Sequence, residues 1–391
     1  MRVLLVSKFY YPRGGDCLAA MRTEALLREN GHQVGVFTMR FPDNVTRPKD
    51  YFTTSQVEFS GSVNSRIKAI RRILGLGDVR ADFARALSEF RPEVVHLHNV
   101  HSYLSPVVAR MAHEAGCRVV WTMHDYKLLC PAYTALRRNR PCLDCAADGP
   151  GHVLARRCMK GSLAASLAAW LEAERWSVVR LSRWVDTFIC PSRFMANAML
   201  RARIPEEKLA VLPNFLPQMP RLTDNRRKYI CYIGRISPEK GVDTLLEAVA
   251  ASGLPLRIAG TGPMADNLRQ RYPACENVTW LGAVAPAEAI KIVSEAECAV
   301  LPARWYENNP LSVIEALCAG THVVAARMGG LPELIDEREN GLLVRPDCPE
   351  ALAEALNDAL NRQWNHASIA AEAQARYAPQ AHYQALMRIY N

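Results

Sequence analysis

Short apolar runs alternate with helix-like segments along the first half of the chain. Val3–Ser7, Gln33–Thr38 and Val94–His98 are rich in β-branched residues, so they predict buried strands. Amphipathic helices are predicted between them, at about Leu18–Glu29 and Leu104–Ala115. Because strands that alternate with helices form parallel sheets, this half predicts a doubly wound α/β domain. Two further strands are expected at Arg118–Met123 and Phe188–Cys190.

The same alternation starts again after a proline-rich stretch. Proline and polar residues from Pro213 to Asn225 predict a linker, and Lys228–Gly234 is typical of a first strand and its turn. We therefore expect Rossmann-like domains at 1–212 and 213–377, with a C-terminal helix in 378–391 that returns to the first domain. Ligands of such sheets bind outside the carboxyl ends of the strands, so we expect a cleft between the two domains. The later strands are expected at Leu256–Ala259, Val278–Leu281, Cys298–Leu301, His322–Ala325 and Gly341–Val344.

Two glutamates, Glu307 and Glu315, bracket a predicted helix start. The helix signals are Asn308 or Asn309 as a cap, Pro310 in the first turn, Leu311 at the start of the apolar run and Gly320 at the end. Free N–H groups at a helix start attract anions, and the two acids can hold hydroxyls on either side. This combination suggests a sugar nucleotide. The alternative is an amphipathic helix with a solvated acid at each end.

Glycine-rich loops follow the first strand of each predicted domain. Gly234 lets the backbone approach a ligand, and Arg235 and Lys240 supply two cations that can stabilise a departing diphosphate without a metal. The alternative is a turn with surface cations. Gly14 and Gly15 can present main-chain N–H groups to phosphates, although a lone Gly-Gly pair also suits a plain tight turn.

Histidines end two strands of the first domain. His124 ends one of them and would contact a sugar hydroxyl, with a satisfied core histidine as the alternative. His96, His98 and His101 end the other, and their spacing does not make them metal ligands. We expect no metal in the site and no cofactor.

Charge is unevenly distributed along the chain, whose net charge is +9. Residues 1–190 hold 27 lysines and arginines against 17 acids, and the rest holds 21 against 22. A basic first half indicates an anionic partner, and no nucleic-acid motif accompanies it, so a phospholipid surface or lipid phosphate fits better. Without a signal peptide or a long apolar run, the expected location is the cytoplasm, at the inner face of the membrane.

Two features of the first half have alternative explanations. Cys130, Cys142, Cys145 and Cys158 lie in an arginine-rich insertion, where a structural zinc site competes with ordinary thiols. A basic amphipathic segment and a tryptophan group suit either a membrane surface or a core. These are Arg66, Ile67, Lys68, Ile70, Arg71, Arg72, Ile73 and Leu74, and Trp170, Trp176 and Trp184.

Together these residues resemble the retaining glycosyltransferases of family 4, which have the GT-B fold. The matching segments, in the family's order, are Gly14–Gly15, Thr122–Tyr126, Cys190–Arg193, Leu212–Asn214, Gly234–Gly241, Ala259–Gly262 and Glu307–Glu315. They span nearly the whole chain. The cysteine-bearing insertion after His124 departs from the pattern, so the acceptor preference of distant relatives does not transfer.

The resemblance implies a role for each matched residue. Arg235 and Lys240 would bind the donor diphosphate, with Gly14, Gly15, Gly234 and Gly262 beside the substrate. Glu315 would hold the ribose, and Glu307, the main chain of 308–311 and His124 would contact the donor sugar. The implied reaction is metal-independent transfer, with retained configuration, from a nucleotide sugar to a glycan or lipid-linked acceptor of a cell-surface polysaccharide or lipopolysaccharide. The alternatives are a sugar-nucleotide epimerase on the same fold and a non-catalytic binding subunit.

Overall fold

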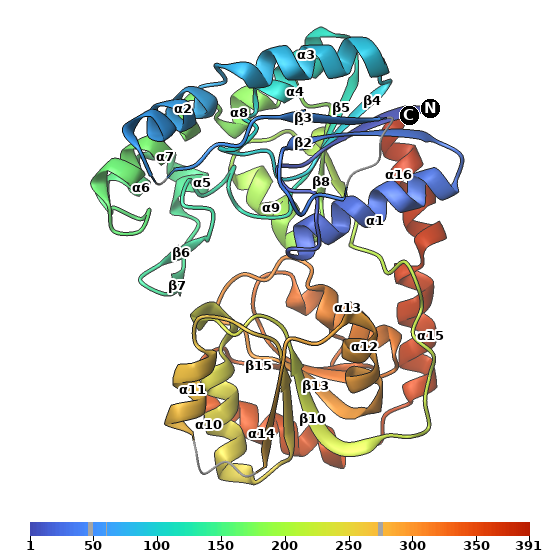
Figure 1. The fold of residues 1–391 in the computed structure, drawn as a ribbon. Coiled ribbons are helices and arrows are strands. Elements are labelled where there is room, and N and C mark those ends of the chain that lie inside the picture. Colours follow the sequence, from blue (N-terminus) through green and yellow to red (C-terminus); the bar gives the residue numbers. More distant parts are fainter. Residues whose placement is uncertain (46–49, 60, 273–276) are drawn as a thin grey trace. The chain divides into compact units, whose positions relative to one another are not determined.

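A computed structural model describes residues 1–45, 50–59, 61–272 and 277–391 of the chain (Figure 1). The chain forms two compact units. The first contains Met1–Ala135, Cys142–Leu212 and Tyr383–Asn391, and the second contains Leu136–Pro141 and Pro213–His382. Each unit has its own sheet and core, so each is described by itself.

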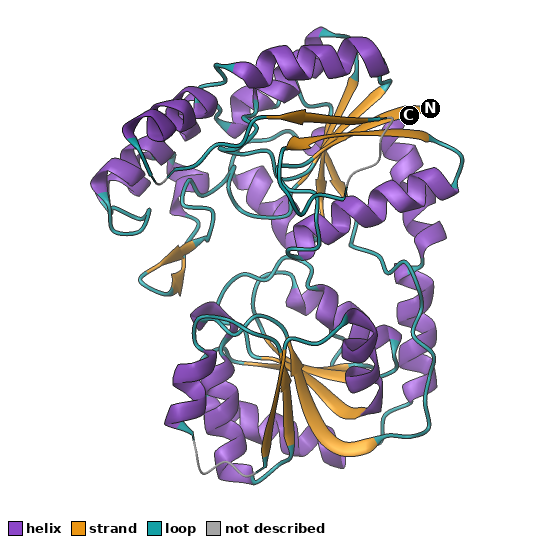
Figure 2. Ribbon diagram, viewed as in Figure 1, coloured by secondary structure: helices purple, strands orange, loops and turns teal. Residues whose placement is uncertain are grey.

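In the described part of the first unit, seven strands form one parallel sheet with the order β3-β2-β1-β4-β5-β8-β9. The first strand, β1, lies inside the sheet, and the chain winds outward from it in both directions. Residues Val3–Val6 of β1 have no exposed surface, because helices cover both faces of the sheet (Figure 2). The strands are β1 (Arg2–Val6), β2 (Gln33–Met39), β3 (Tyr51–Thr54), β4 (Val94–Leu97), β5 (Arg118–Thr122), β8 (Thr187–Cys190) and β9 (Leu209–Val211).

The second unit repeats this architecture. Its described residues form a six-stranded parallel sheet with the order β12-β11-β10-β13-β14-β15. The strands are β10 (Arg227–Ile233), β11 (Leu256–Ala259), β12 (Val278–Gly282), β13 (Ala296–Leu301), β14 (His322–Ala326) and β15 (Gly341–Val344). The predicted pair of doubly wound α/β domains is therefore confirmed.

Helices connect the strands in both units (Figure 1). In the first unit they are α1 (Gly15–Glu29), α2 (Val63–Ile73), α3 (Asp78–Phe90), α4 (Val107–Glu114), α5 (Asp144–Asp148), α6 (Gly151–Ala155), α7 (Leu163–Arg175), α8 (Val178–Leu181) and α9 (Arg193–Arg201). In the second unit they are α10 (Val242–Ser252), α11 (Ala265–Arg271), α12 (Pro286–Glu295), α13 (Leu311–Cys318), α14 (Pro349–Asn361) and α15 (His366–Tyr377). No helix in the described residues combines the length and apolar character that crossing a bilayer requires.

The C-terminal helix α16 (Pro379–Tyr390) contributes to the core of the first unit. Leu386 and Tyr390 are buried in one cluster with Val3 and Leu5 of β1. The Tyr390 hydroxyl also lies 2.7 Å from Nδ1 of His96, and burial raises its pKa well above the usual value. The last residues of the chain are thus tied to the carboxyl end of β4.

Two predicted helix starts are wrong by three residues. Helix α1 begins at Gly15 rather than Leu18, because Gly14 is extended and serves as its N-cap. Helix α4 begins at Val107 rather than Leu104, because Ser105 has a left-handed backbone (φ 65°) that interrupts a helix at that point.

Candidate nucleotide-sugar site

The carboxyl ends of β10 and β13 form the topological switch point of the second sheet. The two strands are neighbours, but the chain continues from β10 to β11 and from β13 to β14, in opposite directions across the sheet. Ligands of open α/β sheets bind at such a point. The loop 234–241 follows β10 and holds Arg235 and Lys240, and the loop 302–310 follows β13 and holds Glu307. Of the other predicted site residues of this unit, Gly262 follows β11, and Leu311 and Glu315 lie in α13.

Lys240 and Glu307 form an ion pair between these loops. Lys240 Nζ lies 2.5 Å from Glu307 Oε1, and the Trp305 indole N–H donates to the same oxygen at 2.7 Å. The Lys240 ammonium also lies 5.2 Å from the centre of the Trp305 ring, within the range of a cation–π contact. The cation and the acid that the resemblance assigns to the diphosphate and the donor sugar therefore bind each other.

Glu307 is a nearly buried carboxylate, with 5% of its surface exposed. Within the described residues, its recorded side-chain partners are Lys240 and Trp305, and both bind Oε1. A buried charge needs partners, so the pair orients the carboxylate and leaves Oε2 to accept a further hydrogen bond.

Arg235 lies just after β10 and is exposed. Its main-chain carbonyl accepts a hydrogen bond of 2.7 Å from the Tyr232 hydroxyl, which fixes the backbone of the loop. Its guanidinium has no recorded partner among the described residues. The loop thus holds one paired cation, Lys240, and one solvated cation, Arg235.

The start of α13 differs from the prediction. Pro310 is extended (φ −70°, ψ 125°) and forms the N-cap, so it does not lie in the first turn, and no side chain caps the helix. Asn309 cannot cap it because its Oδ1 accepts from the Asn214 main-chain N–H at 2.8 Å. Asn214 in turn donates from Nδ2 to the Asn309 carbonyl at 2.8 Å. The first N–H groups of α13 are therefore left for another acceptor.

The predicted end of this helix is confirmed. Gly320 has a left-handed backbone (φ 74°). Its N–H donates to Leu317 at 2.9 Å, and the Thr321 N–H donates to Ala316 at 2.9 Å, which is the Schellman pattern. Glu315 lies in the helix and is half-buried.

Close packing of the backbone requires glycine at positions 260 and 262. A Cβ on Gly262 would collide with the main chain of Ile236, and one on Gly260 would collide with the Gly234 carbonyl. The loops after β10 and β11 therefore lie backbone to backbone. The assignment of Gly234 and Gly262 to substrate binding stays a prediction.

Sequence reasoning missed two features that hold these loops in place. The Gly330 N–H donates to the Glu307 carbonyl at 2.6 Å, and a Cβ on Gly329 would collide with the Glu307 main chain. Arg304 binds Asp243 of α10 at 2.8 Å and Asp347 at 2.7 Å. The sequence carried one signal for the first of these contacts: a second Gly-Gly pair, Gly329-Gly330, follows a strand, β14 (His322–Ala326).

In the first unit, α1 starts at Gly15 directly after the extended Gly14, without a side-chain cap. Asp16 lies in the first turn and accepts a hydrogen bond from the Asn99 side chain. Burial raises the pKa of Asp16, but His124, Lys8 and its hydrogen bonds outweigh burial, so the net shift is below the usual value. The negative Asp16 thus occupies the helix start that the sequence assigned to phosphates.

His98 and His124 follow the neighbouring strands β4 and β5 and form a stacked pair. Nδ1 of His98 lies 2.8 Å from Nε2 of His124, and the ring centres are 5.1 Å apart. Burial lowers the pKa of both imidazoles, so both are neutral near pH 7. Nε2 of His98 is buried without a hydrogen-bond partner among the described residues.

This pairing selects the tautomers of both rings. A buried N–H without an acceptor costs more than a buried lone pair without a donor, so the hydrogen of His98 resides on Nδ1. His98 then donates to Nε2 of His124, and the hydrogen of His124 resides on Nδ1. In this tautomer, Nδ1 of His124 is a hydrogen-bond donor.

The other two histidines of this group, His96 and His101, are both buried. His96 is buried between Tyr390 and the Thr122 hydroxyl, each 2.7 Å from a ring nitrogen, so it is a satisfied core histidine. His101 is buried against Trp121, with ring centres 5.1 Å apart, and burial lowers its pKa to about 3.

Family models match both units of this chain. The model for Glycosyltransferase Family 4 matches residues 21–217, which is half of the chain. The chain belongs to glycosyltransferase family 4. The model for Glycosyl transferases group 1 matches residues 219–380, the part that holds the Lys240–Glu307 pair.

Curated relatives of this glycosyltransferase match mainly over one segment. The D-inositol 3-phosphate glycosyltransferase of Corynebacterium glutamicum is 35% identical over 33% of this chain, and the aligned part spans 34% of that relative. A 42.6 kDa protein encoded in the cps region of Klebsiella pneumoniae is 24% identical over 85% of this chain and 87% of its own length.

Solved structures share the whole fold. The Anabaena HepE protein in complex with UDP and glucose has a TM-score of 0.69 at 17% identity, covering 99% of this chain and 98% of that one. Sucrose-phosphate synthase from Thermosynechococcus elongatus has a TM-score of 0.71 at 18% identity, covering 100% and 98%. WaaG, a glycosyltransferase involved in lipopolysaccharide biosynthesis, has a TM-score of 0.61 at 18% identity, covering 99% and 96%. These likenesses establish the GT-B fold for this glycosyltransferase.

The cysteines of the insertion in this glycosyltransferase influence one another electrostatically. Burial, followed by the thiols of Cys130, Cys158 and Cys142, raises the pKa of Cys145 to about 12. Arg156 lies 4.0 Å from the Cys142 sulfur and binds Asp144 at 2.5 Å. Throughout the described ranges, no group of three or more histidine, cysteine or acidic side chains is arranged to hold a metal ion.

Proposed function

We propose that this glycosyltransferase moves a sugar from a nucleotide-sugar donor to an acceptor hydroxyl and retains the configuration of the anomeric carbon. The observation that carries the proposal is the Lys240–Glu307 pair at the switch point of the second sheet. An ammonium group has three N–H donors, so Lys240 can keep Glu307 in place and still bind a phosphate oxygen. The UDP and UDP-glucose complexes of the structurally similar HepE protein support a nucleotide sugar as the donor.

In this proposal each group of the second unit has one task. The exposed Arg235 and the paired Lys240 bind the diphosphate. The uncapped N–H groups at the start of α13 and the main chain of 308–311 contact the donor, and Glu315 holds the ribose hydroxyls. Glu307 accepts a hydrogen bond from a hydroxyl group of the sugar at Oε2, because Lys240 and Trp305 both bind Oε1.

His124 of the first unit donates from Nδ1 to an oxygen of the donor sugar. This role follows from its tautomer, which His98 selects. A donor at this position stabilises oxygen-centred charge and does not remove a proton. The proton of the acceptor hydroxyl must therefore go elsewhere.

The leaving diphosphate is the group that takes this proton. The bond between the anomeric carbon and the phosphate oxygen breaks, and the bond to the acceptor oxygen forms on the same face, so the configuration is retained. The acceptor proton passes to the departing phosphate oxygen. Arg235 and Lys240 neutralise the growing negative charge, so no divalent metal is required in this proposal.

The proposed acceptor is a lipid-linked or surface glycan. The solved relatives WaaB, a lipopolysaccharide outer core galactosyltransferase, and WaaG support this class, as does the relative encoded in the Klebsiella cps region. The basic first half of the chain suits a phosphate-bearing lipid carrier at a membrane surface.

The proposal is tested by measuring binding of UDP-, GDP- and ADP-sugars, beginning with UDP-glucose. The best donor is then incubated with lipid-linked glycans, and the product anomer is assigned by proton NMR coupling. Transfer with retention, undiminished after dialysis against EDTA, is expected. An inverted product, or loss of activity that returns only with a divalent metal, contradicts the mechanism. Isomerisation of the nucleotide sugar without an acceptor identifies an epimerase instead.

A further inference from the structure

An aromatic cluster lies at the carboxyl end of the first sheet. Phe9 follows β1, Phe41 follows β2 and Tyr103 follows β4. The centre of the Phe9 ring is 5.1 Å from that of Phe41 and 5.4 Å from that of Tyr103. Tyr11 contacts Phe9 and Phe41 with ring centres 5.9 and 6.1 Å apart. Phe59, which follows β3, meets Tyr103 edge-on at 5.2 Å. Rings from four loops thus form one cluster, at the edge of the sheet where ligands of α/β proteins bind.

The aromatic cluster is only partly buried. Phe9 lies at its centre and is 5% exposed, whereas Phe59 is 41% exposed and the other three rings are half-buried. Core packing explains Phe9, but it does not explain four neighbouring rings that keep part of their surface in water. A contiguous apolar surface of this kind is typical of a ligand site.

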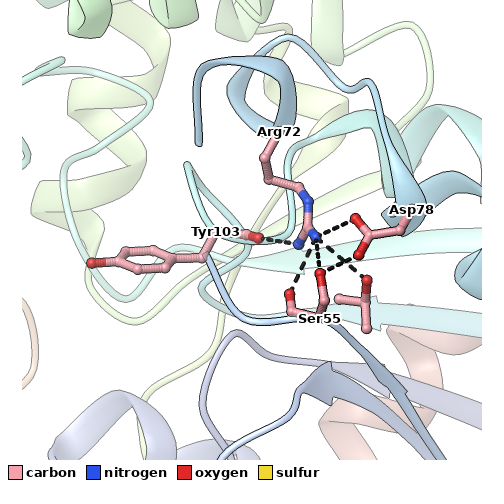
Figure 3. Close-up of polar contacts among 5 residues, drawn as sticks. Ser55, Arg72, Asp78 and Tyr103 are labelled. Carbon is pink, nitrogen blue, oxygen red and sulfur yellow. Dashed lines mark hydrogen bonds and ion pairs between the residues drawn. The ribbon is translucent and has the colours of Figure 1, made fainter. Parts of the chain in front are cut away.

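The backbone of Tyr103 is held in place by Arg72 of α2. The Arg72 side chain is 1% exposed, pairs with Asp78 at 2.6 Å and donates to the Tyr103 carbonyl at 2.7 Å. The Tyr103 ring points away from this group (Figure 3). Trp176 fixes α2 in turn, because its indole N–H donates to the carbonyl of Ile73, the last residue of α2, at 2.7 Å. Core contacts therefore explain Arg72 and Trp176, for which the sequence left a membrane surface open.

The buried Asn44 fixes the loops that carry Phe9 and Phe41. Its Oδ1 accepts from the Tyr10 N–H at 3.2 Å, and its main-chain N–H donates to the Phe41 carbonyl at 3.2 Å. The Phe9 carbonyl accepts from the Ser7 hydroxyl at 3.0 Å. Polar contacts thus set the backbone that presents these rings. A surface that is organised in advance binds a ligand with little ordering cost.

Two cations border the aromatic cluster. The Lys8 ammonium lies 5.8 Å from the centre of the Phe9 ring and 5.6 Å from that of Tyr103. The Arg13 guanidinium lies 4.3 Å from the centre of the Phe9 ring. Throughout the residues that the structure describes, neither cation has a recorded ion pair with a carboxylate. Cation–π contacts leave the N–H groups of both side chains available to an anion.

Lys8 lies within electrostatic range of His124, the proposed contact of the donor sugar. Burial lowers the pKa of His124, and Lys8 acts in the same direction, against Asp16 and Asp125. Lys8 follows β1 and His124 follows β5, at the same edge of one parallel sheet. The aromatic cluster therefore begins close to the residue that is proposed to contact the reacting sugar.

We propose that the aromatic cluster, with Lys8 and Arg13, is a subsite for an acceptor glycan carried on an isoprenoid diphosphate. The first isoprene units pack on the rings, and the diphosphate binds the two cations. This inference rests on the proposed transfer to a lipid-linked acceptor, and it names the chemical class of that acceptor.

Charge and apolar area together select this occupant. A neutral sugar would leave both cations unpaired, and inorganic diphosphate would leave the rings in water. Phe9, Phe41 and Phe59 have no hydroxyl to offer a sugar, so they favour hydrocarbon. A phospholipid phosphodiester carries a single negative charge, whereas a diphosphate diester carries one charge for each of the two cations.

The test is isothermal titration calorimetry of the full chain with farnesyl diphosphate, without donor or vesicles. Farnesyl diphosphate should bind at least tenfold more tightly than inorganic diphosphate or dihexanoyl phosphatidylglycerol. Lys8→Gln and Arg13→Gln should each weaken its binding about tenfold, because each removes a charge-assisted contact. Arg80→Gln, at an exposed arginine of α3 in the same unit, is the matched control and should bind normally.

Ring variants test the apolar contact separately. Phe59→Ala should weaken farnesyl diphosphate at least threefold and leave inorganic diphosphate unchanged, and adding Phe41→Ala should bring the loss to tenfold or more. Phe52→Ala is the control, at a half-buried phenylalanine of β3 that meets Phe90 with ring centres 6.4 Å apart. Phe90 ends α3 before β4, so this ring pair lies toward the amino ends of the strands. Circular dichroism melts check folding, and the exposed Phe59 decides the test if the double variant does not fold.

Three results overturn the proposal. These are absence of farnesyl diphosphate binding by the wild type, equal binding by the Lys8, Arg13 and Phe59 variants, and tighter binding of the phospholipid. Loss of binding in Arg235→Gln would assign the probe to the donor site and overturn it as well. Because no donor is present, failure of the transfer hypothesis leaves the titration intact. Transfer to a water-soluble glycan without farnesyl diphosphate binding would contradict this subsite alone.

Discussion

Nδ1 of His98 lies 2.8 Å from Nε2 of His124, and the two rings stack. This relationship connects a fully buried side chain with one that is half-buried at the end of β5. His98 itself does not reach the half-exposed edge of the pair, so its effect on a substrate passes through His124. It acts as a positioning residue that sets which nitrogen of His124 carries the hydrogen.

His98→Leu should lower kcat by about a hundredfold at most, because a misplaced contact costs up to that factor. His98→Asn, whose Nδ2 can replace the donor, should recover most of the rate. ¹⁵N spectra of labelled histidine provide the readout that a merely structural role would not change. His124 should switch from the Nδ1–H form to a tautomer mixture in the leucine variant only. An unchanged spectrum in that variant would refute the tautomer assignment.

Lys240→Met should reduce kcat/KM by roughly a hundred- to a thousandfold through loss of diphosphate stabilisation. The variant should also lose about 3 kcal/mol of stability, because Glu307 stays buried without its cation. Adding Glu307→Gln to Lys240→Met should restore part of that stability and none of the activity. Urea unfolding and initial rates measure the two effects. If the loss of unfolding free energy in the double variant equals the sum of the losses in the two single variants, the ion pair does not couple the two side chains.

Gly329→Ala should disturb Glu307 directly. Gly329 has a left-handed backbone (φ 59°), and an added Cβ would collide with the Glu307 main chain. Gly282 is the matched control, since it has φ 69° but open space around a Cβ. Gly282→Ala should cost only the left-handed penalty of about 1–2 kcal/mol and leave the rate unchanged. Gly329→Ala should cost more and lower kcat, so equal rates in both variants would argue against a role for this loop.

His322 should make the second unit sensitive to acid. It is fully buried in β14, its ring nitrogens lack partners among the described residues, and burial lowers its pKa to about 3. An unfolded histidine has a pKa near 6.5, so between about pH 6.5 and 3 the unfolded chain binds the extra proton. The free energy of unfolding therefore falls as the pH falls through this window, by about 1.4 kcal/mol per pH unit.

His322→Leu should remove this contribution and move the acid-unfolding midpoint to lower pH. Unfolding followed by tryptophan fluorescence across this range measures the shift. His113→Leu, at an exposed histidine of α4, is the control and should leave the midpoint in place. An identical midpoint in His322→Leu and the wild type would contradict the assignment.

The sequence by itself determined the architecture of this protein. Hydrophobic periodicity located β1 and β10, because a strand buried on both faces must be a continuous apolar run. It also placed Arg235 and Lys240 after one strand and Glu307 after another, since glycine, proline and charge mark such loops. The Schellman end of α13 at Gly320 was readable for the same reason: the signal is local in the chain.

Only the tertiary structure decided which partners those residues have. Lys240 and Glu307 are 67 residues apart in sequence and 2.5 Å apart in space, and Asn214 removed Asn309 from the helix cap across 95 residues. The sequence left the segment that contains Arg72 open between a membrane surface and a core, and long-range contacts with Tyr103 and Ser55 bury this arginine. Periodicity reports which side of a helix is apolar. It does not report which of two apolar sides the rest of the chain covers, because burial is set by packing between elements distant in sequence.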